Sequence, residues 1–165
     1  MTGATDDVDD IVAAWRRERP DLDLGPLEVL SRVSRLARHL DLTRGETFAE
    51  HQLEGYEFDV LVALRRAGTP YQLSPGRLVQ QTLVTSGTMT NRVDRLAARG
   101  LVTRSPDPDD RRGVIVTLTE AGKEVVDAAF SELLDRERRL LAGLSARERD
   151  QLARLLRSLL LPFEA

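Results

Sequence analysis

Polar and basic side chains are concentrated between Ser86 and Arg112, where short hydroxyl and amide groups are interspersed with guanidinium groups. This stretch carries six arginines and four aspartates, a local charge of +2 in a chain whose formal net charge is −3. Short polar side chains can hydrogen-bond to base edges, and arginines bind phosphates. The distribution of charge therefore points to nucleic acid more clearly than the total charge does.

Catalytic and metal-binding chemistry has little support in the same sequence. The chain has no cysteine, and its two histidines, His39 and His51, are 12 positions apart, which matches no metal-ligand or catalytic spacing. It contains no glycine-rich phosphate loop, no nucleophile elbow and no carboxylate pair with an evident partner. We expect both histidines to be solvated or packed, and we expect no enzymatic activity, no cofactor and no metal.

Length and composition limit the remaining classes. A chain of 165 residues with 41% hydrophobic and 31% charged residues is typical of one helix-rich domain. No apolar run approaches the roughly 18 residues of a membrane span. The acidic N-terminus lacks the features of a signal peptide, so we expect a cytoplasmic protein without membrane contact.

Hydrophobic periodicity predicts seven helices and a β-hairpin that together would position the polar stretch. Proline, glycine and capping residues mark most of the boundaries: Pro20, Pro26, Gly68, Ser74-Pro75, Thr85 or Ser86, Gly100, Thr119 and the capping box Ser145–Glu148. The predicted helices span residues 8–19, 26 to the mid-40s, 54–67, 75 to about 82, 86–99, 119–144 and 146–163. Strands are predicted at 101–104 and 114–118, with a charged turn between them.

Two helices joined by a tight link and followed by a β-hairpin form a winged helix-turn-helix. The predicted fold class is mainly α with a small β-hairpin wing, flanked by N- and C-terminal helices for dimerisation. The last two helices carry more apolar surface than one small domain can cover, and a second copy of the chain would cover it. We therefore expect a single domain over residues 1–165, with 1–50 and 119–165 forming a homodimer interface and 54–118 binding DNA.

Three sequence motifs in this order resemble the MarR family of transcriptional regulators. They are a motif at 78–96 that is loosely spaced at its start, from Leu78, and ends in LVTSGTMTNRVDRL, then AARGLVTR at 97–104 and PDDRRGVIVTLTEAG at 108–122. The resemblance extends from about Phe58 to Gly122. It implies that the helix after Thr85 is a recognition helix for double-stranded DNA and that the hairpin is a wing whose tip arginine enters the minor groove.

The resemblance and the residue types together give a set of candidate DNA contacts. On the recognition helix they are Ser86, Thr88, Thr90, Asn91, Arg92 and Arg95, and on the wing they are Asp110, Arg111 and Arg112. By the family's pattern, Asp110 would orient Arg112, which would make the contact in the groove. Helical spacing places Met89, Val93 and Leu96 in the core instead. Asp94 and Arg95 could form a local ion pair or a structural pair typical of the family.

An additional N-terminal helix carries Trp15, the only tryptophan, and resembles the extra helix of the family's urate-responsive branch. The functional residues of that branch correspond here to Trp15, Asp59, Arg92 and Arg104. The resemblance implies a small anionic effector, urate or a related purine or aromatic anion, which would stack on the indole and bind the guanidinium groups. Asp59 paired with Arg92 would be displaced by this anion. Without cysteine, sensing by thiol oxidation is excluded.

The sequence thus predicts a homodimeric repressor that binds a pseudo-palindromic operator and is released by the anion. Two alternatives stay open. In the first, the protein is a DNA-binding dimer without an effector, Trp15 only packs the added helix, and both arginines contact phosphate. In the second, the chain is a non-catalytic protein-interaction module whose charged hairpin is merely solvated.

Overall fold

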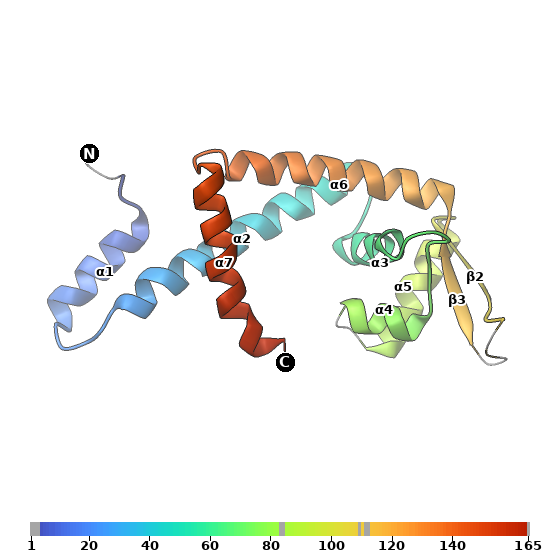
Figure 1. The fold of residues 1–165 in the computed structure, drawn as a ribbon, viewed down its shortest axis with the longest axis horizontal. Coiled ribbons are helices and arrows are strands. Elements are labelled where there is room, and N and C mark those ends of the chain that lie inside the picture. Colours follow the sequence, from blue (N-terminus) through green and yellow to red (C-terminus); the bar gives the residue numbers. More distant parts are fainter. Residues whose placement is uncertain (1–3, 83–84, 109, 111–112, 165) are drawn as a thin grey trace. The chain divides into compact units, whose positions relative to one another are not determined.

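A computed structural model of the protein describes residues 4–82, 85–108, 110 and 113–164. The chain divides into two compact units, Met1–Arg44 and Gly45–Ala165. Helix α1 (Asp7–Glu18) and most of helix α2 (Gly25–Glu50) form the first unit, and α2 continues into the second (Figure 1). The prediction for α2 ended several residues too early, because apolar positions thin out after Leu42.

Ion pairs join α1 to the first half of α2. Asp6 caps α1 through a capping box, and its carboxylate also accepts hydrogen bonds from Arg32 at 2.8 and 3.0 Å. The same guanidinium reaches Asp9 at 2.7 Å, and Arg35 pairs with Asp7 at 2.8 Å. The acidic N-terminus of the sequence therefore serves as the counter-charge for arginines of α2.

The second unit contains the remaining elements in the predicted order. They are α3 (Gly55–Arg66), β1 (Gln72–Leu73), α4 (Pro75–Thr82), α5 (Ser86–Ala98), β2 (Val102–Pro106), β3 (Val114–Leu118), α6 (Glu120–Leu140), α7 (Ala146–Leu160) and a 3-10 turn (Leu161–Phe163). The fold class is confirmed as mainly α with a β-hairpin wing. Gly100 has φ +71°, as expected for a glycine that ends a helix.

The strands form one antiparallel sheet in the order β1-β3-β2. Val102 faces Leu118 and Arg104 faces Val116 across the hairpin, and Gln72 of β1 faces Thr117 of β3. Strand β1 was not predicted, because two residues are too few to show the alternation that indicates a strand. β2 also extends to Pro106, two residues beyond its predicted end.

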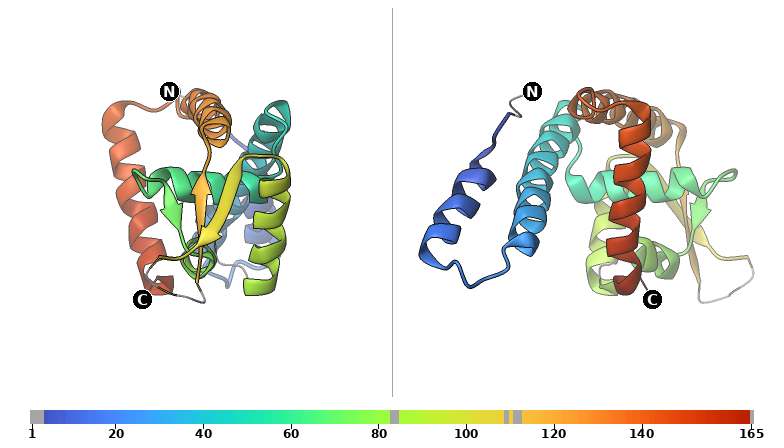
Figure 2. Two further views of the ribbon diagram at one scale, coloured as in Figure 1. Left: turned by 90° about the vertical axis from the view of Figure 1, so that its right-hand side faces the viewer. Right: turned by 60° about the vertical axis from the view of Figure 1, so that its left-hand side comes forward.

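The core of the second unit surrounds α3, which buries residues along most of its length. Leu61 and Leu64 of α3 pack in one cluster with Leu78 of α4, Leu96 of α5 and Val116 of β3. Figure 2 shows the hairpin and helices α3 to α5 gathered together, so the same core supports the helix-turn-helix and the wing.

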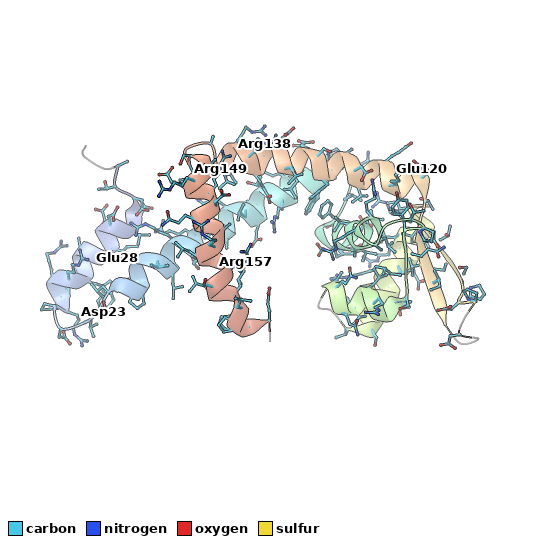
Figure 3. All side chains as sticks on the ribbon, in the orientation of Figure 1. Asp23, Glu28, Glu120, Arg138, Arg149 and Arg157 are labelled. Carbon is cyan, nitrogen blue, oxygen red and sulfur yellow. The ribbon has the colours of Figure 1, made fainter. Side chains whose placement is uncertain are left out.

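The long helix α6 continues from β3 and begins with Thr119, whose hydroxyl accepts a hydrogen bond from the Gly122 amide. Glu120 lies at its first turn and Arg138 near its end, as labelled in Figure 3, an arrangement that suits the helix dipole. The capping box predicted at Ser145–Glu148 is confirmed as the start of α7.

An ionic cluster joins the end of α2 to α6. Arg136 bonds to Glu50 at 2.5 Å and to Glu132 at 2.6 Å, and Glu132 also contacts His51 at 2.9 Å. The Arg136 guanidinium, followed by the His51 contact, lowers the pKa of Glu132 to about 2. His51 is thus packed rather than solvated, which was one of the two expectations for this residue.

No helix within the described ranges is both long and apolar enough to span a bilayer.

Candidate nucleic-acid interface

Helix α5 separates its side chains onto two faces. Met89, Val93 and Leu96 are at most 2% exposed, which confirms the prediction that they belong to the core. The opposite face carries the predicted DNA contacts: Ser86, Thr88, Thr90, Asn91 and Arg95 are exposed, and Arg92 is half-buried. A helix fixed by one apolar face can therefore present a polar and basic face without losing stability.

The start of α5 presents several hydroxyl groups at one end of the helix. The Thr85 hydroxyl caps the helix by accepting from the Thr88 amide at 3.4 Å, and it lies 2.9 Å from the Thr88 hydroxyl. The Thr90 hydroxyl donates to the Ser86 carbonyl at 3.2 Å. The N-terminal end of a helix favours anions, since its first amides are unpaired and its dipole is positive. This end of α5 suits a phosphate.

Tyr56, near the start of α3, contacts both arginines of the exposed face. The Arg92 guanidinium lies 5.1 Å from the centre of the Tyr56 ring, and Arg95 donates a hydrogen bond to its hydroxyl at 3.3 Å. This hydrogen bond raises the pKa of Arg95 above its ordinary value. Tyr56 also lines an open depression of about 220 Å³ together with Thr88, Asn91 and both arginines. Sequence reasoning missed Tyr56, because nothing local in the sequence links it to residues more than 30 positions away.

An ion pair between the buried Glu57 carboxylate and the exposed Arg99 fixes the other end of α5. Arg99 donates to Glu57 at 2.5 Å and to the backbone carbonyl of Gln52 at 2.7 Å. Glu57 is 3% exposed, and its carboxylate also accepts from the Glu54 amide. A buried carboxylate needs such partners, so this pair secures the orientation of α5 against α3.

The hairpin closes through Gly113. The Asp107 amide donates to the Gly113 carbonyl at 3.0 Å, and the Gly113 amide donates to the Asp110 carbonyl at 2.8 Å. A Cβ at Gly113 would lie 2.7 Å from the Asp107 Cβ, so only glycine fits this turn. Asp110 is exposed. The predicted contacts Arg111 and Arg112 fall outside the described residues.

The four proposed effector residues line different depressions or contact different partners. Trp15 belongs to the first unit, is 48% exposed, and lines an apolar depression of about 290 Å³ on α1. Asp59 lines a second depression of about 250 Å³, whose other lining residues are Val62, Arg66, Gln81 and Thr82. Of the two arginines, Arg92 lies against the Tyr56 ring. Arg104 of β2 forms an ion pair with the Asp94 carboxylate of α5. A local ion pair with Arg95 was one of the two alternatives for Asp94; in the structure Asp94 pairs with Arg104 and so links α5 to the wing.

Among the residues that the structure describes, no group of three or more histidine, aspartate or glutamate side chains could hold a metal ion.

Comparisons with known proteins agree on one family. The MarR family model matches residues 51–113. The HTH-type transcriptional regulator PecS of Dickeya dadantii is 38% identical over 150 residues, which cover 91% of this chain and 90% of PecS.

Solved structures of the same family share the fold. A variant of Escherichia coli MarR in complex with operator DNA matches with a TM-score of 0.68 and 29% identity, covering 84% of this chain and 99% of the other. A structure of Bordetella bronchiseptica BpsR, whose DNA binding is regulated by 6-hydroxynicotinic acid, matches with a TM-score of 0.66 and 30% identity. That alignment covers 79% of this chain and 91% of BpsR.

Proposed function

Because this chain belongs to the MarR family of DNA-binding transcriptional regulators, which are not enzymes, we propose that it is a homodimeric repressor released from its operator by a small anion. The observation that carries the DNA-binding site is the exposed face of α5, where hydroxyl, amide and guanidinium groups stand on a helix held by a buried face. This helix would enter the major groove.

Within this proposal the two ends of α5 have different roles. The hydroxyl-rich first turn, including Ser86 and Thr88, would meet phosphates and base edges. Asn91 is suited to adenine, and Arg92 and Arg95 are suited to guanine or phosphate. The Glu57–Arg99 pair supports this assignment, because it holds the far end of the helix against the core.

The wing would lie over the adjacent minor groove. Asp110 lies in the turn that Gly113 closes between β2 and β3. An arginine at this tip, Arg112 in our proposal, would be attracted by the negative potential of a narrow minor groove. The link between Arg104 and Asp94 would keep the wing and α5 in register with each other.

Apolar side chains left exposed by the single chain support the dimer. Helix α7 buries none of its residues, and its Leu155, Leu159 and Leu160 are each more than half exposed. Phe163, in the following turn, is 86% exposed. Apolar surface of this kind favours association with a second copy. A two-fold dimer would bind half-sites about one helical turn, roughly 34–36 Å, apart.

An anionic effector is the second part of the proposal. It is supported by the exposed Trp15 indole, by the arginines of α5 and β2, and by regulation of BpsR through an aromatic carboxylic acid. An anion bound to Arg104 would compete with Asp94 and so loosen the link between the wing and α5. Urate or a related purine or aromatic anion remains our candidate, with Trp15, Asp59, Arg92 and Arg104 as its binding residues. The alternative is a DNA-binding dimer without an effector.

The test combines a duplex selected from a random library by the wild-type protein with a panel of purine and aromatic anions. A repressor of the proposed kind should lose DNA affinity by about 5- to 150-fold when the effector saturates it. The selected duplex should reciprocally weaken effector binding by the same factor. Binding of an anion with no change in DNA affinity would refute the switch, and binding of none would favour the alternative.

A further inference from the structure

Two arginines of α5 converge on a single side chain of another helix. Tyr56 offers each a different group: its ring faces the Arg92 guanidinium at 5.1 Å, and its hydroxyl accepts from Arg95 at 3.3 Å. Arg92 and Arg95 are one turn apart, and Thr88 and Asn91 complete the depression around them. One aromatic residue thus bridges the guanidinium groups on the face proposed to read DNA.

Such contacts have a specific physical effect on arginine. A free arginine side chain on a helix surface samples many rotamers, and ordering it on binding reduces the affinity that its contacts provide. Tyr56 has only two side-chain torsions and is half-buried, and it lies beside Glu57 and Phe58, which are both buried in the core. It therefore belongs to the rigid part of the molecule and can restrain two mobile side chains before DNA arrives.

We propose that Tyr56 is a positioning residue for DNA recognition, whose ring orients Arg92 and whose hydroxyl orients Arg95 toward the major groove. Tyr56 acts through these arginines. This inference rests on the proposed placement of α5 in the groove. It adds a role for a residue of α3, a helix for which no contact with DNA is proposed.

Two substitutions separate the two contacts. Tyr56→Phe removes the hydroxyl and keeps the ring under Arg92, and it should weaken DNA binding about two- to tenfold, the equivalent of one net hydrogen bond. Tyr56→Leu also removes the ring and should cost a further factor of about two to five, as expected for an exposed cation–π contact. The order wild type, Phe, Leu is therefore the expected ranking of affinity.

The salt dependence of DNA binding is a measurement that would stay unchanged if Tyr56 had only a structural role. Each phosphate contact contributes about −0.9 to the slope of log affinity against log salt concentration. If Arg95 is oriented toward a phosphate by Tyr56, then Tyr56→Phe should make this slope shallower, toward the value for Arg95→Gln. Thermal melting of the free protein should stay close to that of wild type, because the hydroxyl serves an exposed side chain.

The second tyrosine of the chain is a matched control. Tyr71 also lies between cations, with Arg65 at 5.0 Å and Lys123 at 5.9 Å from its ring, but these belong to α3 and α6 rather than to the recognition helix. Tyr71→Phe removes the same hydroxyl and should leave DNA affinity and the salt slope unchanged. Equal effects of Tyr56→Phe and Tyr71→Phe would overturn the proposal.

The Arg95→Gln variant separates failure of this inference from failure of the proposed interface. All variants are measured as full-length proteins on the duplex selected by wild type. If Arg95→Gln weakens binding and Tyr56→Phe does not, Tyr56 has no positioning role although α5 reads DNA. If Arg95→Gln itself has no effect, the proposed interface is wrong. Tighter binding by Tyr56→Phe would show that Tyr56 withholds Arg95 from DNA, which also contradicts the proposal.

Discussion

Replacing Gly122 with alanine tests how the wing and the recognition helix are held together. Gly122 lies in the first turn of α6, close to Leu101 in the link between α5 and β2. A Cβ added there would lie 2.1 Å from the Leu101 carbonyl oxygen and 2.9 Å from a methyl group of Leu118. Because the nearest atom belongs to the backbone, no side-chain rotation can relieve the contact.

The cost follows from the shift that this contact requires. Cβ atoms essentially never approach closer than 3.0 Å, so α6 and the link must separate by about 0.9 Å. This movement strains two hydrogen bonds of Thr119, from its amide to Leu101 at 3.1 Å and from its hydroxyl to Gly100 at 2.8 Å. Overpacking costs about 1–3 kcal/mol, and one lost hydrogen bond adds roughly 0.5–1.5 kcal/mol. We expect Gly122→Ala to lower the free energy of unfolding by about 2–4 kcal/mol.

Thermal and urea denaturation at fixed protein concentration measure this loss, which should lower Tm by roughly 5–15 °C in a chain of this size. Gly45→Ala is the matched control, since Gly45 is an exposed interior residue of α2 with no atom within 4 Å of an added Cβ. There the same change should stabilise by roughly 0.5–1 kcal/mol through helix propensity. A Gly122→Ala protein as stable as wild type would refute the reasoning from close contact.

Three further predictions concern acid stability, assembly and the wing. The pKa of Glu132 is lowered from 4.5 to about 2, so its ionised carboxylate should stabilise the fold fully above pH 4.5 and lose this effect as the pH falls toward 2. Glu132→Gln should therefore make the free energy of unfolding depend less on pH between 4.5 and 2, as measured by denaturation. Leu159→Glu, at a side chain 51% exposed on α7, should shift the protein toward monomer in sedimentation, and an unchanged dimer would exclude α7 from the interface. Arg112→Ala should weaken operator binding by about 1–3 kcal/mol without changing Tm, and unchanged affinity in a titration would refute the minor-groove assignment.

Local signals in the sequence were enough to predict most helices and their ends. The cap at Thr85, the capping box at Ser145 and the glycine at Gly100 are each decided within a few residues, and all are present in the structure. The buried face of α5 was equally predictable, because helical periodicity places Met89 and Leu96 on one side.

Features that depend on distant parts of the chain could not be predicted in this way. Strand β1 forms only because β3 offers it a pairing edge. The contacts of Tyr56 with α5, and the exchange of the expected Asp94–Arg95 pair for Asp94 with Arg104, arise from packing between elements. The assignments of Trp15 and Asp59 to an effector came from resemblance alone and stay predictions.

The two faces of α5 also bear on how such a regulator can diverge. Stability depends on the face that packs into the core, whereas operator preference in our proposal depends on the face that is exposed. Surface substitutions usually change stability by less than about 0.5 kcal/mol, so Ser86, Thr90 or Asn91 can be exchanged without unfolding the protein. After gene duplication, one copy could therefore acquire a new set of target promoters through a few neutral changes on this face, while its fold stays the same.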